Sequence, residues 1–217
     1  MIDWLNGMKS EIKRVYVEPA TGLMLELFMN RFQRSIEDLE VQDRYIKCEE
    51  INYKRLHFKI KNSFSSYSAW YTLDFLFSLG CEQIEAFFTN FSGKELNVFL
   101  RSWQEGKTNQ KLNRIKISTC RNEIMSHVLK DCEAELIDPR TTKLKFQDPI
   151  DLDIWIHGGI HFRRNDGRLA VIDINYEASE ETKEEVSEKH IQKYLREREM
   201  WDSGRHSVAC GFHICFF

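Results

Sequence analysis

A short apolar signature returns at wide intervals along the chain. It consists of one apolar residue, a second three positions later, and a third two positions after that. Its copies occupy residues 12–17, 53–58, 81–86 and 112–117. From the second copy onward the middle apolar residue moves from position 56 to 84 and then to 115, steps of 28 and 31 residues. Strand–helix units that cannot bury their own apolar face repeat in this way, because each must stack on the next.

Helix-like segments follow the copies of this signature. Apolar residues at helical spacing predict helices over 21–34, around 70–79 and near 122–130, and a helix with a clear start over 92–106. Ser92 and Glu95 form a capping box at that start, and Leu96, Phe99, Leu100 and Trp103 lie on one face behind it. Residues 35–50 are polar and poorly patterned, which is typical of a loop or a degenerate repeat. We therefore expect an α/β protein that begins as a stack of repeats over 1–137.

The pattern changes after Pro139. Alternation predicts a half-buried strand over 151–156, and Asp166-Gly167 between two apolar runs predicts a β-hairpin over 161–172. The segment 177–201 is highly charged with a weak apolar stripe, which indicates a solvated helix. Residues 208–217 are apolar enough for a strand or a docked tail, and the pattern does not decide between them.

Composition limits the classes of function. The net charge is −3, with 31 basic and 34 acidic residues, so charge favours neither nucleic acid nor an anionic membrane as a partner. No apolar run has the length of a membrane span, and the first 20 residues do not resemble a signal peptide. The six scattered cysteines are then expected to be reduced and mostly buried in an intracellular protein, cytoplasmic or nuclear.

Three groups of residues resemble chemical sites only in part. Gly106-Lys107-Thr108 matches the end of a phosphate-binding loop, but the glycine required five positions earlier is Arg101, so a helix end is the better interpretation. The carboxylates among residues 148–153 alternate along a strand and point to solvent. No nucleophile elbow or catalytic cysteine–histidine context is present. These residues predict no enzyme and no cofactor.

Histidines and cysteines do not form a recognisable metal module either. The C-terminal candidates are His206, Cys210, His213 and Cys215, whose spacing matches no common zinc module. His157 and His161 are separated by two glycines, which argues against a helix presenting both on one face. Trp70 and Trp103 are expected to pack in the core. No metal site is predicted.

Two segments resemble a known family when they are taken together. The stretch from Trp70 to Leu76, followed by Leu96-Asn97-Val98-Phe99-Leu100-Arg101-Ser102-Trp103-Gln104-Glu105-Gly106, is similar to the core of the nematode F-box associated region, type 2. The hairpin residues 162–172 resemble a later segment of the same family, and the resemblance covers roughly residues 1–175. The motif positions carried over as structural are Trp70, Leu73, Leu96, Asn97, Phe99, Leu100, Trp103, Gly106, Arg164, Asp166, Gly167 and Ile172.

The resemblance implies a role in protein recruitment. In such proteins an F-box binds the adaptor of an SCF ubiquitin ligase, and the associated region is expected to select the protein to be ubiquitinated. Adaptor binding is expected only if the full-length protein has an F-box, and none is recognisable in this sequence. The expected organisation is a family region over 1–176, with strand–helix repeats (1–137) resembling a leucine-rich-repeat-like solenoid and a hairpin part (145–176). A charged helix and apolar tail (177–217) follow.

The strand residues predicted to point outward define a candidate protein-binding face. They are Lys13, Arg14, Lys54, Arg55, His57, Glu82, Gln83, Arg114 and Lys116. Ordinary solvated surface is the plain alternative for each of them. Two further functions remain open: a free-standing interaction domain that binds or masks a partner, and an enzyme with an unrecognised site. The sequence does not identify the target protein.

Overall fold

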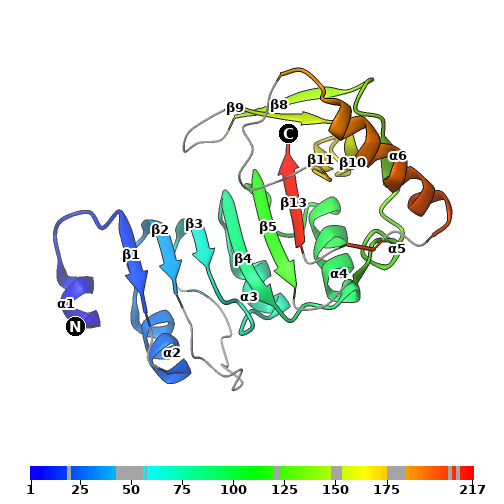
Figure 1. Cartoon of the computed structure of the whole chain (residues 1–217). Helices are drawn as coiled ribbons and strands as arrows, with labels where there is room; N and C mark the ends of the chain where they lie inside the picture. The colour runs from blue at the N-terminus through cyan, green and yellow to red at the C-terminus, as the bar shows by residue number, and fades with distance from the viewer. Residues whose placement is uncertain are drawn as a thin grey trace.

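The computed structural model describes residues 1–18, 21–42, 56, 58–119, 123–147, 153–174, 184–204, 207–208 and 211–217. The apolar signature folds into strands because its second and third apolar residues alternate with polar ones, as a strand with one buried face requires. Five parallel strands lie side by side in chain order (Figure 1): β1 Arg14–Val17, β2 Ile36–Val41, β3 Ile60–Ser65, β4 Gln83–Thr89 and β5 Arg114–Thr119.

The strand registers align the signature across the sheet. The middle residue of each copy stands beside that of the next strand, in the row Val15, Leu39, Ser63, Ile84 and Ile115. Successive members of the row are 24, 24, 21 and 31 residues apart. Equivalent residues, apolar in each of these strands except β3, therefore stack on one another, which is why these units share one core.

The structure corrects two of the predicted repeats. Residues 36–41, interpreted as part of a loop or degenerate repeat, form β2 and carry the signature as Ile36, Leu39 and Val41. The copy of the signature at 53–58 predicts a strand there, but the strand of this repeat, β3, begins at Ile60. Within 53–58 the structure describes positions 56 and 58, and neither lies in a strand.

Serines in β3 explain why its repeat was misplaced. Ser63 and Ser65 occupy the second and third positions of the signature, and both are buried. Ser63 Oγ lies 3.2 Å from the hydroxyl of Tyr71, so the two buried polar groups satisfy each other. The apolar signature therefore cannot be recognised in this strand, whereas residues 53–58, which precede it, match the signature.

Helices cover one face of the parallel strands. α2 (Gly22–Arg31), α3 (Leu73–Ser78) and α4 (Gly93–Gln104) follow β1, β3 and β4. The predicted capping box is confirmed at α4, where Ser92 Oγ accepts from the Glu95 N–H and the Glu95 carboxylate accepts from the Ser92 N–H at 2.8 Å. Right-handed crossovers place such helices on the same face, and their buried residues join those of the strands in one core. We call this the inner face of the sheet and the opposite one the outer face.

Antiparallel strands complete the nine-stranded sheet. β13 (Gly211–Phe216) pairs with β5, and β11 (Leu169–Ile172), β10 (Gly159–Arg163) and β7 (Glu135–Ile137) follow in that order. The predicted hairpin is confirmed as β10 and β11. The apolar segment near the end of the chain forms a strand in the middle of the sheet, drawn in red beside β5 in Figure 1.

A separate hairpin covers part of the outer face. β8 (Lys143–Gln147) pairs with β9 (Asp153–His157), which is the strand predicted over 151–156. Phe146 and Ile156 pack against Val171 and Cys215 of β11 and β13, forming a second core. The outer face of β1–β5 carries no comparable apolar cluster among the described residues.

The remaining elements lie around the sheet. The charged helix is confirmed as α6 (Glu188–Asp202), whose only buried residue is Tyr194. α5 (Met125–Val128) is the short helix predicted near 122–130. The smaller elements are α1 (Ile2–Gly7) and a two-stranded pair of β6 (Glu123–Ile124) with β12 (Ser207–Val208).

The α/β class is confirmed, whereas the solenoid prediction is not. Four strands of the large sheet run antiparallel to their neighbours, which a continuous strand–helix solenoid would not contain. The division at 176/177 stays a prediction, and the sheet crosses it, because β13 pairs with strands from the first part.

Candidate protein-binding surface

Two rows of side chains cross the outer face of β1–β5. The row nearer the amino ends of the strands contains Arg14, Asp38, Asn62, Gln83 and Arg114. The second row contains Tyr16, Glu40, Phe64, Glu85 and Lys116. Both rows alternate with the buried row of the inner face, because successive strand residues point to opposite faces. The outer face is therefore mainly polar and charged.

Polar contacts tie neighbouring strands together along the first row. Arg14 forms an ion pair with Asp38 at 3.1 Å, and Asn62 Nδ2 donates to the other oxygen of Asp38 at 2.9 Å. Such exposed pairs contribute only about 0–1 kcal/mol to stability. They do hold the side chains in fixed positions, which lowers the entropy lost when a partner binds.

The outer face becomes less exposed toward β5. Glu85 contacts Lys116 at 2.9 Å and Arg114 at 3.5 Å, and the Arg114 side chain is buried. Gln83, next in the row to Arg114, is only 6% exposed, and its Nε2 has no hydrogen-bond partner among the described residues. A buried donor that lacks a hydrogen-bond partner lowers the stability of the folded protein. Because this Nε2 is enclosed, Gln83 belongs to the closed end of the outer face and not to its open contact surface.

Aromatic side chains gather at the carboxyl ends of β3 and β4. Tyr67 and Phe88 stack with ring centroids 4.9 Å apart, and they remain 43% and 49% exposed. Phe64 and Phe87 meet edge to face at 5.9 Å, with Phe64 in the second row of the outer face. We call these four residues the aromatic edge.

The backbone at Phe88 is strained. Phe88 has φ +55°, in the left-handed region that bulky residues rarely adopt, at a bulge between Ala86 and Thr89. Its N–H donates to Ser118 Oγ at 2.8 Å, which fixes the bulge to β5. A residue in such a conformation costs about 1–3 kcal/mol and is found preferentially at functional sites. In a regular strand the Phe88 ring would point to one face of the sheet. At the bulge the ring remains exposed.

The predicted binding residues do not all lie on an exposed surface. Lys13 and Arg14 are exposed, whereas Glu82 and Lys116 are half-buried. Gln83 and Arg114 are buried, which differs from the expectation that they line open surface, because the outer face is covered toward β13. Lys54, Arg55 and His57 lie outside the described residues.

The aromatic edge was missed in the sequence. Two adjacent aromatics, Phe87 and Phe88, follow the alternating Ile84 and Ala86, and neighbouring strand residues cannot both point into the core. This pair was therefore the available signal for an exposed ring. Tyr67 lies in a serine-rich turn, where nothing local distinguishes an exposed aromatic from a buried one.

Most of the family-motif residues are structural. Trp70, Leu96, Phe99, Leu100, Trp103 and Ile172 are buried in the main core, and Leu73 is partly buried against it. Trp70 precedes α3 rather than lying on it. Asn97 Nδ2 donates to the carbonyls of Val128 and Lys130 at 2.9 and 2.7 Å, joining α4 to the segment after it. Gly106, with φ +70°, ends the turn after α4.

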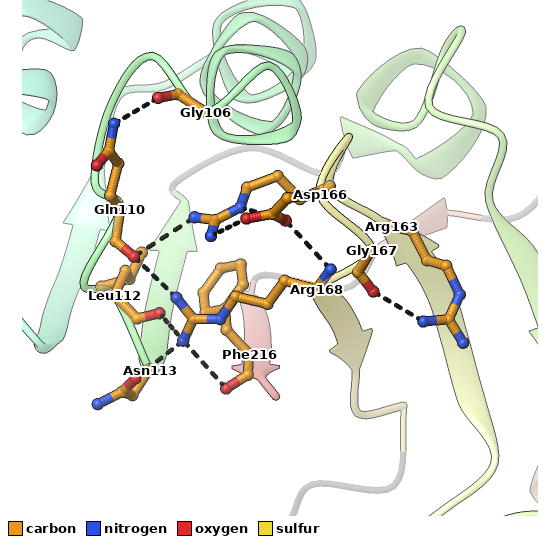
Figure 2. A network of polar contacts seen from close by, with 10 residues as sticks. Gly106, Gln110, Leu112, Asn113, Arg163, Asp166, Gly167, Arg168 and Phe216 are labelled. Carbon is orange, nitrogen blue, oxygen red and sulfur yellow. Dashed lines mark hydrogen bonds and ion pairs between the residues drawn. The ribbon is translucent and has the colours of Figure 1, made fainter.

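The hairpin motif holds the loop before β5, as Figure 2 shows. Arg168 donates to the carbonyls of Gln110 and Leu112 and to the side chain of Asn113, all at 2.8–2.9 Å. Arg164 forms a bidentate pair with Asp166, which lowers the pKa of that carboxyl to about 2, and it also reaches the Gln110 carbonyl at 3.4 Å. The hairpin thus fixes the position of residues 110–113.

One group of side chains has the composition of a catalytic triad but not its accessibility. Cys215 Sγ lies 3.6 Å from His213 Nε2, and His213 Nδ1 lies 3.9 Å from an Asp173 oxygen. All three are buried, and burial raises the pKa of the Cys215 thiol, which disfavours the thiolate that a nucleophile requires. Cys81 and Cys132 are also free and buried, with burial raising the pKa of each thiol.

The described part of the chain contains no cluster of metal-ligating side chains. His206 and Cys210 lie outside it, while His213 and Cys215 are buried in β13. His157 is buried, and the His161 ring contacts the Gly158 carbonyl at 3.0 Å. None of the helices among the described residues is long and apolar enough to cross a membrane.

Residues 47–117 match the family model described as F-box associated. This match includes β3, β4 and the Leu96–Gly106 motif, and it confirms the resemblance over that part of the chain. The hairpin motif lies outside the matched residues. No curated protein and no solved structure matches the chain.

Proposed function

We propose that this protein is a protein-interaction module that recruits target proteins to an SCF-type ubiquitin ligase. The F-box associated match over 47–117 supports an interaction role. The recruitment role is carried over from that family, in which the ubiquitin transfer belongs to other subunits of the ligase. Binding of the SCF adaptor would require an F-box in the full-length protein.

The aromatic edge is the observation that carries the proposed binding role. Interfaces are anchored by a few aromatic and arginine residues surrounded by polar contacts. Tyr67 and Phe88 supply exposed rings held by the bulge, and the polar rows of the outer face lie beside them. Strain that persists at an exposed position is explained if the ring is needed for contact with a partner.

We further take β1–β5 and their helices to form a short leucine-rich-repeat-like solenoid whose open side is the outer face. Four aligned copies of the signature, together with β3, in which Ser63 and Ser65 replace its second and third apolar residues, support this view. The protein would then act without catalysis of its own. The burial of the three described thiols, with the raised pKa of each, is consistent with that proposal.

The test is affinity purification of the tagged endogenous protein from its native cells, followed by mass spectrometry. Co-purification of the SCF adaptor and cullin with other specific partners is the expected result. If specific partners are recovered without adaptor and cullin, the ligase role is wrong and the protein binds or masks its partner independently. Recovery of no specific partner would contradict the interaction role itself.

A further inference from the structure

A cavity of about 670 Å³ opens at the amino ends of the central parallel strands. Its wall is formed by the beginnings of β2 and β3, the end of α3, the residues leading into β4, and the loop 107–111. This volume is in the range of small-ligand and peptide pockets. The cavity is distinct from the aromatic edge, which lies at the carboxyl ends of β3 and β4.

The floor of the cavity is apolar. Ile36, Phe58, Ile60, Phe77 and Leu79 line it, together with the buried thiol of Cys81. An apolar floor favours a ligand that inserts a bulky apolar group, since burying such a group contributes about 1.5–3 kcal/mol.

The rim of the cavity is positively charged. Among the described residues, four lysines and one carboxylate residue, Glu82, line it; the lysines are Lys59, Lys61, Lys107 and Lys111. Lys61 is paired with Glu82 at 3.9 Å and Lys107 with Glu105 at 2.5 Å. Lys59 and Lys111 form no ion pair within the ranges that the structure describes. The rim therefore favours an anionic ligand, although the chain as a whole carries a net charge of −3.

A buried acceptor in the cavity wall has no partner. Asn109 is 6% exposed, and its Nδ2 donates to the carbonyls of Leu76 and Leu79 at 3.1 and 2.7 Å. Its Oδ1 has no hydrogen-bond partner among the described residues. A buried acceptor left unpaired costs free energy that a donor from a ligand would recover.

The loop that carries Asn109 is held from behind. The carbonyl of Gln110 accepts from both Arg168 and Arg164, and the Gln110 side chain donates to the Gly106 carbonyl at 2.7 Å. The family hairpin therefore fixes one wall of the cavity before any ligand arrives. A preformed wall lowers the entropic cost of binding.

These observations favour one kind of ligand. The unpaired Asn109 Oδ1 can accept only from an N–H or O–H group, so a ligand that reaches this atom must carry one. The rim requires anionic groups and the floor an apolar one. A peptide supplies all three, through its main-chain N–H groups, acidic side chains and one bulky apolar side chain. We propose that this cavity binds a short acidic segment of the recruited protein, anchored by one large apolar residue. This rests on the proposed function only in taking that segment from the recruited protein.

The test uses the full chain and a defined peptide set. The probes are fluorescein-labelled nine-residue peptides of Glu and Gly with one central Leu, Ile, Met, Phe, Tyr or Trp, measured by fluorescence anisotropy. We expect at least one to bind with Kd below about 1 mM, and binding to weaken as salt is added. The same peptides with Lys in place of Glu should not bind.

Two independent variants place the binding in the cavity. Gly80→Phe places a ring at a position that lines the cavity, without backbone strain, because a Cβ at Gly80 meets nothing within 4 Å and Gly80 is not among the glycines with positive φ. Lys59→Glu/Lys111→Glu reverses the unpaired charges of the rim. Each should weaken binding at least about tenfold, whereas Lys94→Glu, an exposed change on α4, should not. Thermal unfolding establishes that each variant is folded, and either folded variant alone decides the question.

Several outcomes would overturn this proposal. They are the absence of binding by every acidic peptide, equal binding of the lysine peptides, and unchanged affinity in the cavity variants. Preferential binding of a labelled uridine oligonucleotide would assign the site to nucleic acid instead. Tyr67→Ala/Phe88→Ala should leave peptide affinity unchanged, so failure at the cavity is distinguishable from failure of the aromatic edge to bind a partner.

Discussion

The guanidinium of Arg168 donates to the main-chain carbonyl of Gln110 at 2.8 Å. This contact joins two segments that lie 58 residues apart in the chain. It connects the hairpin motif with the loop between α4 and β5, and through that loop with the Asn109 cavity. Arg168 is therefore a residue that holds the wall of the Asn109 cavity in place.

Arg168→Ala should lower the free energy of unfolding by about 2–3 kcal/mol, because it leaves several carbonyls without a charged donor. Arg168→Lys should not restore the loss, since an ammonium cannot reproduce the planar fork that reaches Gln110, Leu112 and Asn113. Urea unfolding measures both. Arg163→Ala is the control, because among the described residues that exposed side chain donates only to the Gly167 carbonyl, and it should change stability by less than about 1 kcal/mol. Equal effects of Arg163→Ala and Arg168→Ala would contradict this role.

The strain at Phe88 predicts an unusual order of stabilities. Phe88→Ala and Phe88→Gly both remove the ring, but only glycine adopts φ +55° without penalty. The glycine variant should therefore be more stable by about 1 kcal/mol in urea unfolding. At Phe87, which is not among the positive-φ residues, the order should reverse. The same order at both positions would show that Phe88 is not strained.

The buried pair of Ser63 and Tyr71 predicts a coupled response. Ser63→Val puts an apolar side chain in the inner row but removes a hydrogen-bond partner of the Tyr71 hydroxyl, so it should destabilise by about 1–3 kcal/mol. Adding Tyr71→Phe should recover most of that loss. A double-mutant cycle in urea gives the coupling free energy, and a value near zero would mean that the hydroxyls do not depend on each other.

Acid should destabilise the fold through His213. Burial lowers the pKa of His213 below its ordinary value of 6.5, and Asp173 offsets this only in part. The unfolded chain therefore takes up a proton that the folded chain resists, so stability is lost as the pH falls through 6.5. The pKa of His161 is lowered by burial in the same direction. Urea midpoints on either side of this pH should fall toward acid, and His213→Gln should flatten the dependence. An unchanged slope would exclude His213 as its source.

Local patterns predicted those elements that local chemistry determines. β1, β4 and β5, the capping box of α4, the hairpin and α6 all follow from short-range periodicity and turn residues. β2 was missed although Ile36, Leu39 and Val41 satisfy the signature, because its acidic residues made the segment look like a loop. β3 was misplaced because serines stand where the pattern expects apolar residues.

Long-range pairing could not be predicted from the same patterns. Nothing in Gly211–Phe216 indicates that this strand inserts between β5 and β11. The β8–β9 hairpin packs on Val171 and on Cys215, which is the neighbour of Arg114 in the sheet. Arg114 and Gln83 are buried, so the predicted face is only partly open. Exposure of Phe88 depends on a bulge, and bulges have no reliable sequence signal apart from glycine.

The central claim is that the aromatic edge binds the recruited protein. The most direct measurement is quantitative co-purification of partners from native cells with wild-type protein, Tyr67→Ala/Phe88→Ala, and the control Leu27→Ala/Val98→Ala. The control residues are 45% and 49% exposed, matching Tyr67 and Phe88 at 43% and 49%, but lie on α2 and α4. We predict that the aromatic variant reduces recovery of specific partners at least about tenfold and that the control does not. Equal recovery with the aromatic variant and wild type would contradict the claim.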